Sequence, residues 1–245
     1  MYNVKVMSRH SKWSKIKHTK GAADVVKGKV FTKLGRAISV AARHGGDPIT
    51  NFQLRIAIDA ARAANMPKET VERAIRRGTG EEGGGVIEEV LYEGYGPGSV
   101  AIVVEGTSDN KNRTAPNIRH IFSKHNGSLG GANSVLWMFE RRGVIRVPHP
   151  EQGAEELILT LIDLGAEDVK EEDDGLTVLV SPDKLEEVKG AIEQKGIAVE
   201  YAEREYAPKD RLAIGDPEVR AKVEGLIEEL DEDDDVANVY TNADI

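Results

Sequence analysis

Positive charge gathers near the N-terminus, in the segment from Ser8 to Lys20, with no acidic residue to balance it. Cations without a neighbouring acid suit contact with the phosphates of an external polyanion. Trp13 has a face large enough to stack on a base, although packing onto a helical core is an equally good expectation for it. For the segment as a whole, the alternative is a solvated tail. Its candidate binding residues are Lys12, Trp13, Lys15, Lys17 and Lys20.

Further cations fall on one face of a helix expected from Val25 to about Arg43, opposite apolar side chains that recur at three- and four-residue steps. A third expected helix carries arginines near its end. Each of these two helix faces alone is an ordinary solvated surface. Together with the opening segment, they predict one cationic surface that binds phosphate. Such contacts position a protein without reading a base sequence. The candidate residues are Lys29, Lys33, Arg36, Arg73, Arg76 and Arg77.

A second, smaller group of cations lies on the helix expected at 114–125 and just before it, with only Asp109 as a nearby acid. A solvated helix face is the favoured interpretation of this group, and contact with RNA is the alternative. Its candidate residues are Lys111, Arg113, Arg119 and Lys124, with His120 beside them.

The residue patterns that build catalytic or metal sites do not occur in the sequence. The absence of cysteine excludes disulfides, thiolate metal sites and a cysteine nucleophile. There is no G-x-S-x-G, P-loop or H-E-x-x-H pattern, and the acidic runs 171–174 and 231–235 lack the spaced ligands and central glycine of a calcium loop. We interpret these runs as solvated turns, and predict no enzymatic activity, cofactor, metal or small-molecule substrate.

The charge of the chain is divided along its length. Residues 1–77 hold 17 Lys and Arg against 5 Asp and Glu, a net charge of +12, whereas the rest holds 16 against 37, a net of −21. This asymmetry fits a basic part that meets a polyanion and an acidic part that keeps the chain off non-specific sites. No apolar run reaches the roughly 18 residues of a membrane span, so we expect no membrane partner and a cytoplasmic location.

The pattern predicts helices first and strands later. Three short helices are expected at about 25–43, 51–64 and 67–78, the last ending at Gly78, and together they form a small bundle. The stretch from Thr79 to Gly85 is typical of a flexible linker. Strands at 86–93 and 99–105, a helix at 114–125 and a strand at 134–139 follow.

From Val144 a second cycle runs strand, helix, strand, strand, helix, strand, the order of a ferredoxin-like sandwich. A last helix at 217–230 and a strand at 236–240 cannot form a core alone, so they are expected to complete the earlier sheet. The predicted fold class is therefore α+β in three domains, with both α/β domains of ferredoxin-like plan. The domains are a basic helical bundle at 1–78, a discontinuous α/β domain at 79–141 and 207–245, and an inserted α/β domain at 142–206.

Several stretches together resemble one protein family. HSKWSKIKHTKGAADVVKGKVFTKL, GGDPITN, LYEGYGPG, SDNKNRTAPNIRHIFSKHNGSLG and SVLWMF are similar to the YebC/PmpR family, which includes the mitochondrial translational activator of cytochrome oxidase. The similarity runs from Ser8 to Tyr240, and Met1 to Val6 looks like an extension. Ser99 and Asn133 stand where the family often has glycine, so local turn geometry is expected to differ there. The resemblance implies a helical bundle followed by two α/β domains, without an accepted enzymatic activity.

Two functions remain open at this point. The resemblance implies a translation factor associated with RNA and the ribosome, which binds rRNA or tRNA and eases elongation through proline-rich sequences. The alternative is a DNA-binding transcriptional regulator, the label that the family has long carried. Charge alone does not separate them. If the second and third helices imitate a helix-turn-helix, the exposed residues of the third include Glu69 and Glu72 but no Asn or Gln that reads adenine. This favours backbone binding over sequence readout.

Overall fold

The structure is a computed structural model that describes residues 23–82, 87–150, 153–172 and 175–244. The chain divides into two compact units, one of residues 1–138 with 208–245 and one of residues 139–207. The second unit is inserted in the first, between Met138 and Pro208. Each unit is described below by itself.

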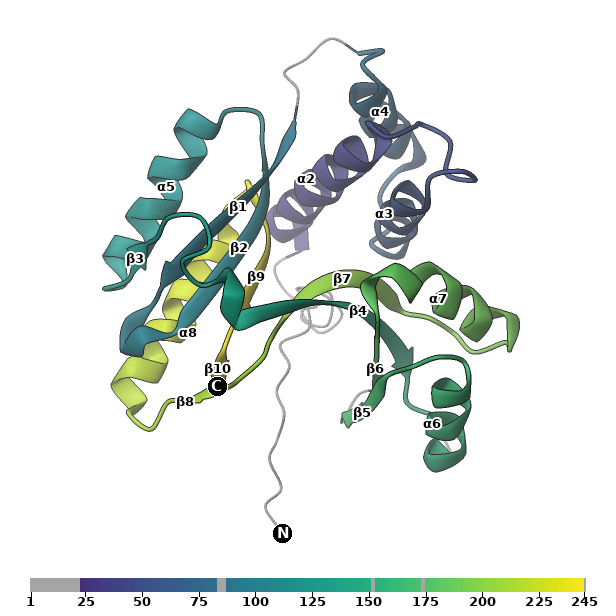
Figure 1. The fold of residues 1–245 in the computed structure, drawn as a ribbon. Coiled ribbons are helices and arrows are strands. Elements are labelled where there is room, and N and C mark those ends of the chain that lie inside the picture. The colour runs from purple at the N-terminus through teal and green to yellow at the C-terminus, as the bar shows by residue number, and fades with distance from the viewer. Residues whose placement is uncertain (1–22, 83–86, 151–152, 173–174, 245) are drawn as a thin grey trace. The chain divides into compact units, whose positions relative to one another are not determined.

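The first unit begins with three helices, α2 (Ala23–Ala42), α3 (Phe52–Ala63) and α4 (Lys68–Thr79) (Figure 1). Their shared core contains Ile38 from α2, Leu54 and Ile58 from α3, and Val71 from α4. The side-chain oxygen of Asn51 accepts a hydrogen bond from the amide of Leu54, which caps α3. The three helices that the apolar periodicity predicts are therefore confirmed.

The last of these helices ends later than predicted. Sequence analysis ends it at Gly78, but α4 continues to Thr79, and Gly80 is the residue with left-handed backbone angles (φ 82°). Gly78 lies inside the helix, where a Cβ atom would be 2.2 Å from the carbonyl oxygen of Ser39 on α2. Glycine is needed at 78 because the two helix backbones approach closely there, not because the helix stops.

The remainder of the first unit is a sheet covered on one face. Its strands are β1 (Glu88–Tyr95), β2 (Ala101–Ser108), β3 (Ser128–Leu129) and β9 (Val236–Thr241), in the order β3-β1-β2-β9. Helices α5 (Lys111–Lys124) and α8 (Pro217–Glu232) pack into one core with β2, as Phe122, Leu226 and Val104 show (Figure 1). A short 3-10 turn (Pro97–Ser99) joins β1 to β2, and β8 (Leu212–Ala213) pairs in parallel with β10 (Ala243–Asp244).

The strand predicted at 134–139 is wrong. The segment is an ordered loop with a 3-10 turn at Leu136–Met138, and the third strand of the sheet is β3 instead. The reason is a buried carboxylate on β1: Glu93 accepts hydrogen bonds from the amides of Asn133 (2.7 Å), Val135 (2.9 Å) and Leu136 (2.7 Å). Because these three amides donate to Glu93, they are not available to pair with a neighbouring strand.

The second unit is a four-stranded sheet with two helices. Along the chain it contains β4 (Phe139–Pro148), α6 (Ala154–Asp163), β5 (Asp168–Glu172), β6 (Gly175–Val180), a 3-10 turn at Pro182–Lys184, α7 (Leu185–Gln194) and β7 (Tyr201–Pro208). The strand order is β5-β6-β4-β7, and β6 pairs antiparallel with both β5 and β4. Its buried side chains include Ile145, Leu161, Val178, Leu185 and Ile192.

The α+β class is thus confirmed: a region of three helices precedes α/β units with two antiparallel sheets. Among the described helices, none is long and apolar enough to cross a membrane.

Candidate nucleic-acid interface

The opening cationic segment falls outside the part of the chain that the structure describes. Lys12, Trp13, Lys15, Lys17 and Lys20 precede Ala23, the first described residue. Their role in binding stays a prediction.

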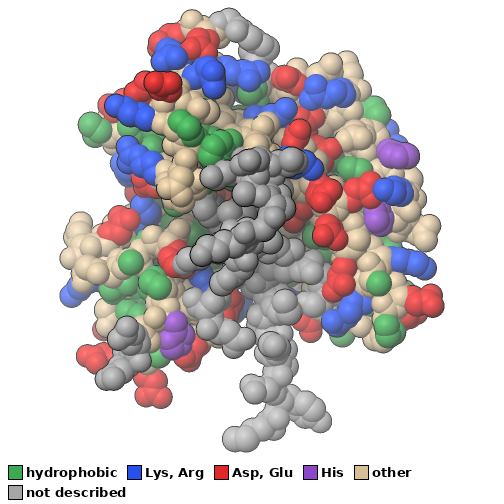
Figure 2. Space-filling view, turned by 180° about the vertical axis from the view of Figure 1, so that it is seen from behind, with side chains coloured by type: hydrophobic (Ala, Val, Ile, Leu, Met, Phe, Trp, Pro, Cys, Tyr) green, Lys and Arg blue, Asp and Glu red, His purple; other side chains and the backbone are tan. Residues whose placement is uncertain are grey.

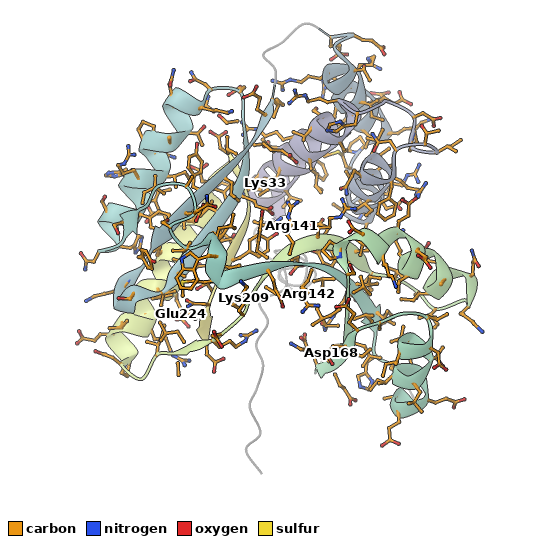
Figure 3. The ribbon with its side chains drawn as sticks, viewed as in Figure 1. Lys33, Arg141, Arg142, Asp168, Lys209 and Glu224 are labelled. Carbon is orange, nitrogen blue, oxygen red and sulfur yellow. The ribbon has the colours of Figure 1, made fainter. Side chains whose placement is uncertain are left out.

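The cationic face of α2 does not point at solvent along its whole length. Lys29 is exposed, but Lys33 and Arg36, one and two turns further on, contact the acidic run 231–235 at the end of α8. The ammonium group of Lys33 donates hydrogen bonds to the carbonyl oxygens of Asp231 (2.9 Å) and Val236. Figure 3 shows Lys33 where α2 approaches β9. The face that sequence analysis assigns to an external polyanion therefore meets the chain's own acidic segment.

Arg36 makes the same connection with more contacts. Its guanidinium donates to the carbonyl oxygens of Thr107 (3.2 Å) and Asp234 (3.0 Å) and contacts the carboxylate of Asp235. The side chains of Arg36 and Asp235 are 18% and 9% exposed. With most of its surface covered and its Nη1 group in use, Arg36 serves packing between α2 and the sheet, and we leave it out of the proposed binding surface.

Asp235 is the centre of this cluster, which we call the Asp235 cluster: Arg36, Arg113, Thr114 and Asp235. Arg113 donates to both carboxylate oxygens (2.8 and 3.1 Å), and the hydroxyl group of Thr114 donates at 2.6 Å. Burial alone would raise the pKa of Asp235, but the hydrogen bonds from Thr114, Arg113 and Arg36 outweigh it and lower that pKa below its usual value. The interpretation of the run 231–235 as a solvated turn is corrected here, because Asp235 is 7% exposed.

The exposed face of α4 keeps two free cations. Arg73 and Arg77 are exposed, one turn apart, and neither side chain forms an ion pair or hydrogen bond with a described residue. Arg76 forms a salt bridge with Glu82 (2.9 Å), and Lys68 pairs with Glu72 (3.6 Å). Figure 2 shows blue and red side chains interleaved over the helical region at its upper left. Lys29 on α2 is likewise exposed.

The second predicted patch is largely neutralised. Lys111 pairs with Glu88 (2.6 Å), Arg113 with Asp109 (3.0 Å) and Asp235 (2.8 Å), and Lys124 with Glu229 (2.8 Å). Apart from Asp109, the acids come from β1, from α8 and from the residue before β9, so sequence neighbours do not reveal them. Only Arg119 and His120 of that group, both exposed, have no partner among the described residues. The geometry favours the solvated helix face over an RNA contact.

Sequence analysis missed the loop that Glu93 organises. Trp137 in this loop is 66% exposed, and the ammonium group of Lys209 donates to its carbonyl oxygen (2.7 Å). The motif SVLWMF marked this segment, but its pattern of apolar residues resembles a strand. Within the described ranges, His, Asp and Glu form no group of three or more that could hold a metal ion.

Two family descriptions match the chain. Residues 11–81 match "TACO1/YebC protein N-terminal domain", and residues 87–243 match "TACO1/YebC second and third domain". The boundary between the two matched ranges lies between α4 and β1.

Individual relatives agree over the full length. A probable transcriptional regulatory protein of Thermoanaerobacter pseudethanolicus is 50% identical over 241 residues, which is 98% of each chain. A protein of the same name from Moorella thermoacetica is 51% identical over 242 residues, covering 98% of this chain and 96% of its own. The crystal structure of the conserved hypothetical protein Aq1575 from Aquifex aeolicus superposes with a TM-score of 0.87 at 45% identity, covering 95% of this chain and 96% of that one.

Proposed function

This chain belongs to the TACO1/YebC family, and from that premise we propose that it is a nucleic-acid-binding regulator of gene expression whose helical region contacts the phosphate backbone. The observation that carries the proposal is the pair Arg73 and Arg77, exposed on α4 without an internal partner. Exposed arginines without an internal partner can bind phosphate through bidentate hydrogen bonds. We propose that Lys29 and the opening segment, through Lys12, Lys15, Lys17 and Lys20, add further phosphate contacts.

The names of the relatives support a DNA target. Proteins half identical to this chain are named probable transcriptional regulatory proteins, so duplex DNA is the partner that the comparisons favour. The described residues of α4 include no Asn or Gln, the side chains that read adenine in the major groove. Glu69 and Glu72 would face the duplex beside the arginines. We therefore propose that α4 binds the backbone and leaves sequence reading to another element or to DNA shape.

A second candidate function is an RNA- and ribosome-associated translation factor that eases elongation through proline-rich sequences. The family resemblance suggests it, and the lack of base-reading side chains on α4 is compatible with binding to rRNA or tRNA phosphates as well as to DNA. No step of either function needs a catalytic residue, a cofactor or a small-molecule substrate from this chain.

We also propose a division of labour within the fold. Residues 1–78 bind nucleic acid, residues 79–141 with 207–245 form a middle α/β domain, and residues 142–206 form an inserted domain of ferredoxin-like plan. The strand order β5-β6-β4-β7 of the inserted unit supports that plan, because its first strand lies between its third and last.

The deciding experiment measures binding against salt concentration for the full chain and for the double variant R73E/R77E. Charge reversal at 73 and 77 should lower the affinity for any duplex or RNA, and the log-log salt slope should fall by roughly 0.7–0.9 for each lost phosphate contact. The matched control is K170E/K195E, which makes the same charge change at two exposed lysines of the second unit. Equal loss in both variants would show a general charge effect and remove α4 from the interface.

The two targets are separated by comparing a promoter duplex, a scrambled duplex and ribosomes. A transcriptional regulator should prefer the promoter duplex by a large factor. Co-sedimentation with ribosomes that persists after DNase treatment and weakens as salt rises would instead establish the translation factor.

A further inference from the structure

Trp137 is a large apolar side chain placed in solvent. It is 66% exposed, in the 3-10 turn (Leu136–Met138) that precedes β4. Exposing an indole forgoes the favourable burial of a large apolar surface. An exposed aromatic ring in an ordered segment is available for contact with a partner.

The loop that carries Trp137 is fixed from below. Glu93, 5% exposed, accepts the amide hydrogens of Asn133, Val135 and Leu136, three bonds from one buried carboxylate. Val135 is fully buried beside them. Charge-assisted hydrogen bonds of this kind are about twice as strong as neutral ones. Trp137 is thus presented by a rigid support, and a binding partner would not have to order the loop.

The polar group of the indole is already in use. The ring N–H of Trp137 donates to the carbonyl oxygen of Ser134 (3.1 Å), and the same oxygen accepts from the hydroxyl group of Tyr95 (3.0 Å). The hydrogen bond holds the ring in one orientation. What Trp137 offers a partner is therefore the surface of its π system, which recognises flat groups by stacking.

The exposed cation of Lys209 contacts the backbone of Trp137. Lys209 is exposed, and its ammonium group donates one hydrogen bond to the carbonyl oxygen of Trp137 (2.7 Å), while the backbone amide of Lys209 donates to Met138 (2.9 Å). An ammonium group has three donors, so two remain available. Figure 3 labels Lys209.

We propose that Trp137 and Lys209 form a binding site for one unpaired nucleobase and its adjacent phosphate, with the base stacked on the indole and the phosphate at the ammonium group. The inference rests on the proposed function, since it deepens the binding of nucleic acid by this chain. A flat base needs one aromatic face and one cation, and both are present. A peptide ligand would need several aromatic side chains in a groove or a free strand edge, so the base is the better fit.

The test uses the full chain with Trp13→Phe, in which Trp137 is the single remaining tryptophan of the two in the sequence. Its fluorescence is followed during titration with single-stranded RNA and DNA of about 12 nucleotides, a length within the range of single-strand binding sites. An abasic strand of equal length, a duplex and a proline-rich peptide complete the set. We expect quenching by the base-containing single strands alone.

Affinity variants separate stacking from charge. Trp137→Ala should weaken single-strand binding by about 5- to 100-fold without changing the salt slope, while Trp137→Phe keeps most of the affinity. Lys209→Gln should lower the slope by about 0.7. The matched control is Leu159→Ala, which removes a side chain of comparable exposure (64%) from α6 in the second unit.

Each outcome has one meaning. Binding of single strands by Trp137→Ala with unchanged affinity overturns the site but leaves the proposed function standing. Quenching by the peptide and not by the strands makes Trp137 a protein contact and also overturns it. If the full chain binds no nucleic acid, the proposed function is wrong, and the proposed site is wrong with it.

Discussion

Arg36 and Asp235 lie 199 residues apart in the sequence, and their side chains contact each other in the first unit. The contact joins α2 to the start of β9. Glycine at position 106 lets β2 lie close to the backbone of Asp235, because a Cβ atom there would be 2.3 Å from the carbonyl oxygen of Asp235. A cation that resembles part of a nucleic-acid surface in the sequence thus holds the helical region against the sheet.

Replacing Asp235 by Asn should destabilise the first unit. The variant leaves Arg36 facing a neutral amide and removes charge-assisted bonds from Arg113 and Thr114, so we expect a loss of about 2–3 kcal/mol in the free energy of unfolding. Urea unfolding followed by circular dichroism measures the loss. Asp234→Asn is the control, because that side chain is exposed, and its effect should stay within about 0.5 kcal/mol. Equal values for both variants would contradict the assigned role of Asp235.

The same residue sets a pH dependence. Because the pKa of Asp235 in the folded chain lies below its ordinary value of 3.8, its contribution to stability is fully present above that value. The contribution is lost as pH falls from about 3.8 through the folded pKa. Glu88 and Glu229 also have lowered pKa values, through Lys111 and through Lys124 with His125, and act with the same sign. Urea midpoints between about pH 5 and pH 3 should therefore fall more steeply for the parent chain than for Asp235→Asn. Parallel curves would contradict this.

Local patterns were enough to predict most of the elements. The three helices of the first region follow from apolar residues at helical spacing, and α3 begins at Phe52, one residue after its predicted start, with Asn51 as its cap. The short pairs β3 and β8 with β10 were missed because two-residue strands leave no pattern. The predicted strand at 134–139 failed for a different reason. Its apolar content is that of a strand, but a carboxylate some 40 residues earlier in the sequence takes its amides.

The candidate site was harder to predict because free charge is a tertiary property. Lys33 and Arg73 look alike in the sequence, each a cation on an amphipathic helix, yet Lys33 bonds to the carbonyl oxygen of Asp231 at the end of α8 while Arg73 faces solvent. The acids that neutralise Lys111 and Lys124 come from β1 and α8. Net charge along the sequence therefore locates a basic region, and only the fold shows which of its cations remain available.

Glu93→Gln should loosen the loop around Trp137. A Gln side chain turns one acceptor oxygen into an NH2 group that faces backbone donors, so at least one amide among Asn133, Val135 and Leu136 loses its partner. We expect a cost of about 2–4 kcal/mol and faster amide hydrogen exchange across 133–136. The exposed neighbour Glu89, changed to Gln, is the control and should leave exchange unchanged. Slow exchange in both variants would mean that Glu93 does not hold the loop.

Ser99→Gly should stabilise the chain. Ser99 adopts φ 61°, a left-handed conformation that costs an L-residue about 1–2 kcal/mol, while glycine gives back about 0.5–1 kcal/mol in chain entropy. The expected net gain is about 0.5–1 kcal/mol, read as a rise in the thermal midpoint. Asn133→Gly tests the same logic at φ 62°, where the gain should be smaller because Asn tolerates this region. A lower midpoint for Ser99→Gly would contradict the strain.

Two glycine-to-alanine changes should have opposite signs although both lie inside helices. Alanine is the better helix former by about 0.8–1 kcal/mol, so Gly190→Ala on α7, where a Cβ atom meets nothing within 4 Å, should stabilise by up to that amount. At Gly78 the new Cβ atom would lie 2.2 Å from the carbonyl oxygen of Ser39 and 2.7 Å from the Cβ of Ala42, so α2 and α4 must separate. We expect Gly78→Ala to cost about 2–3 kcal/mol, since overpacking outweighs propensity. Chemical denaturation of both variants measures the two signs. A stabilised Gly78→Ala would show that the two helices do not cross at this position.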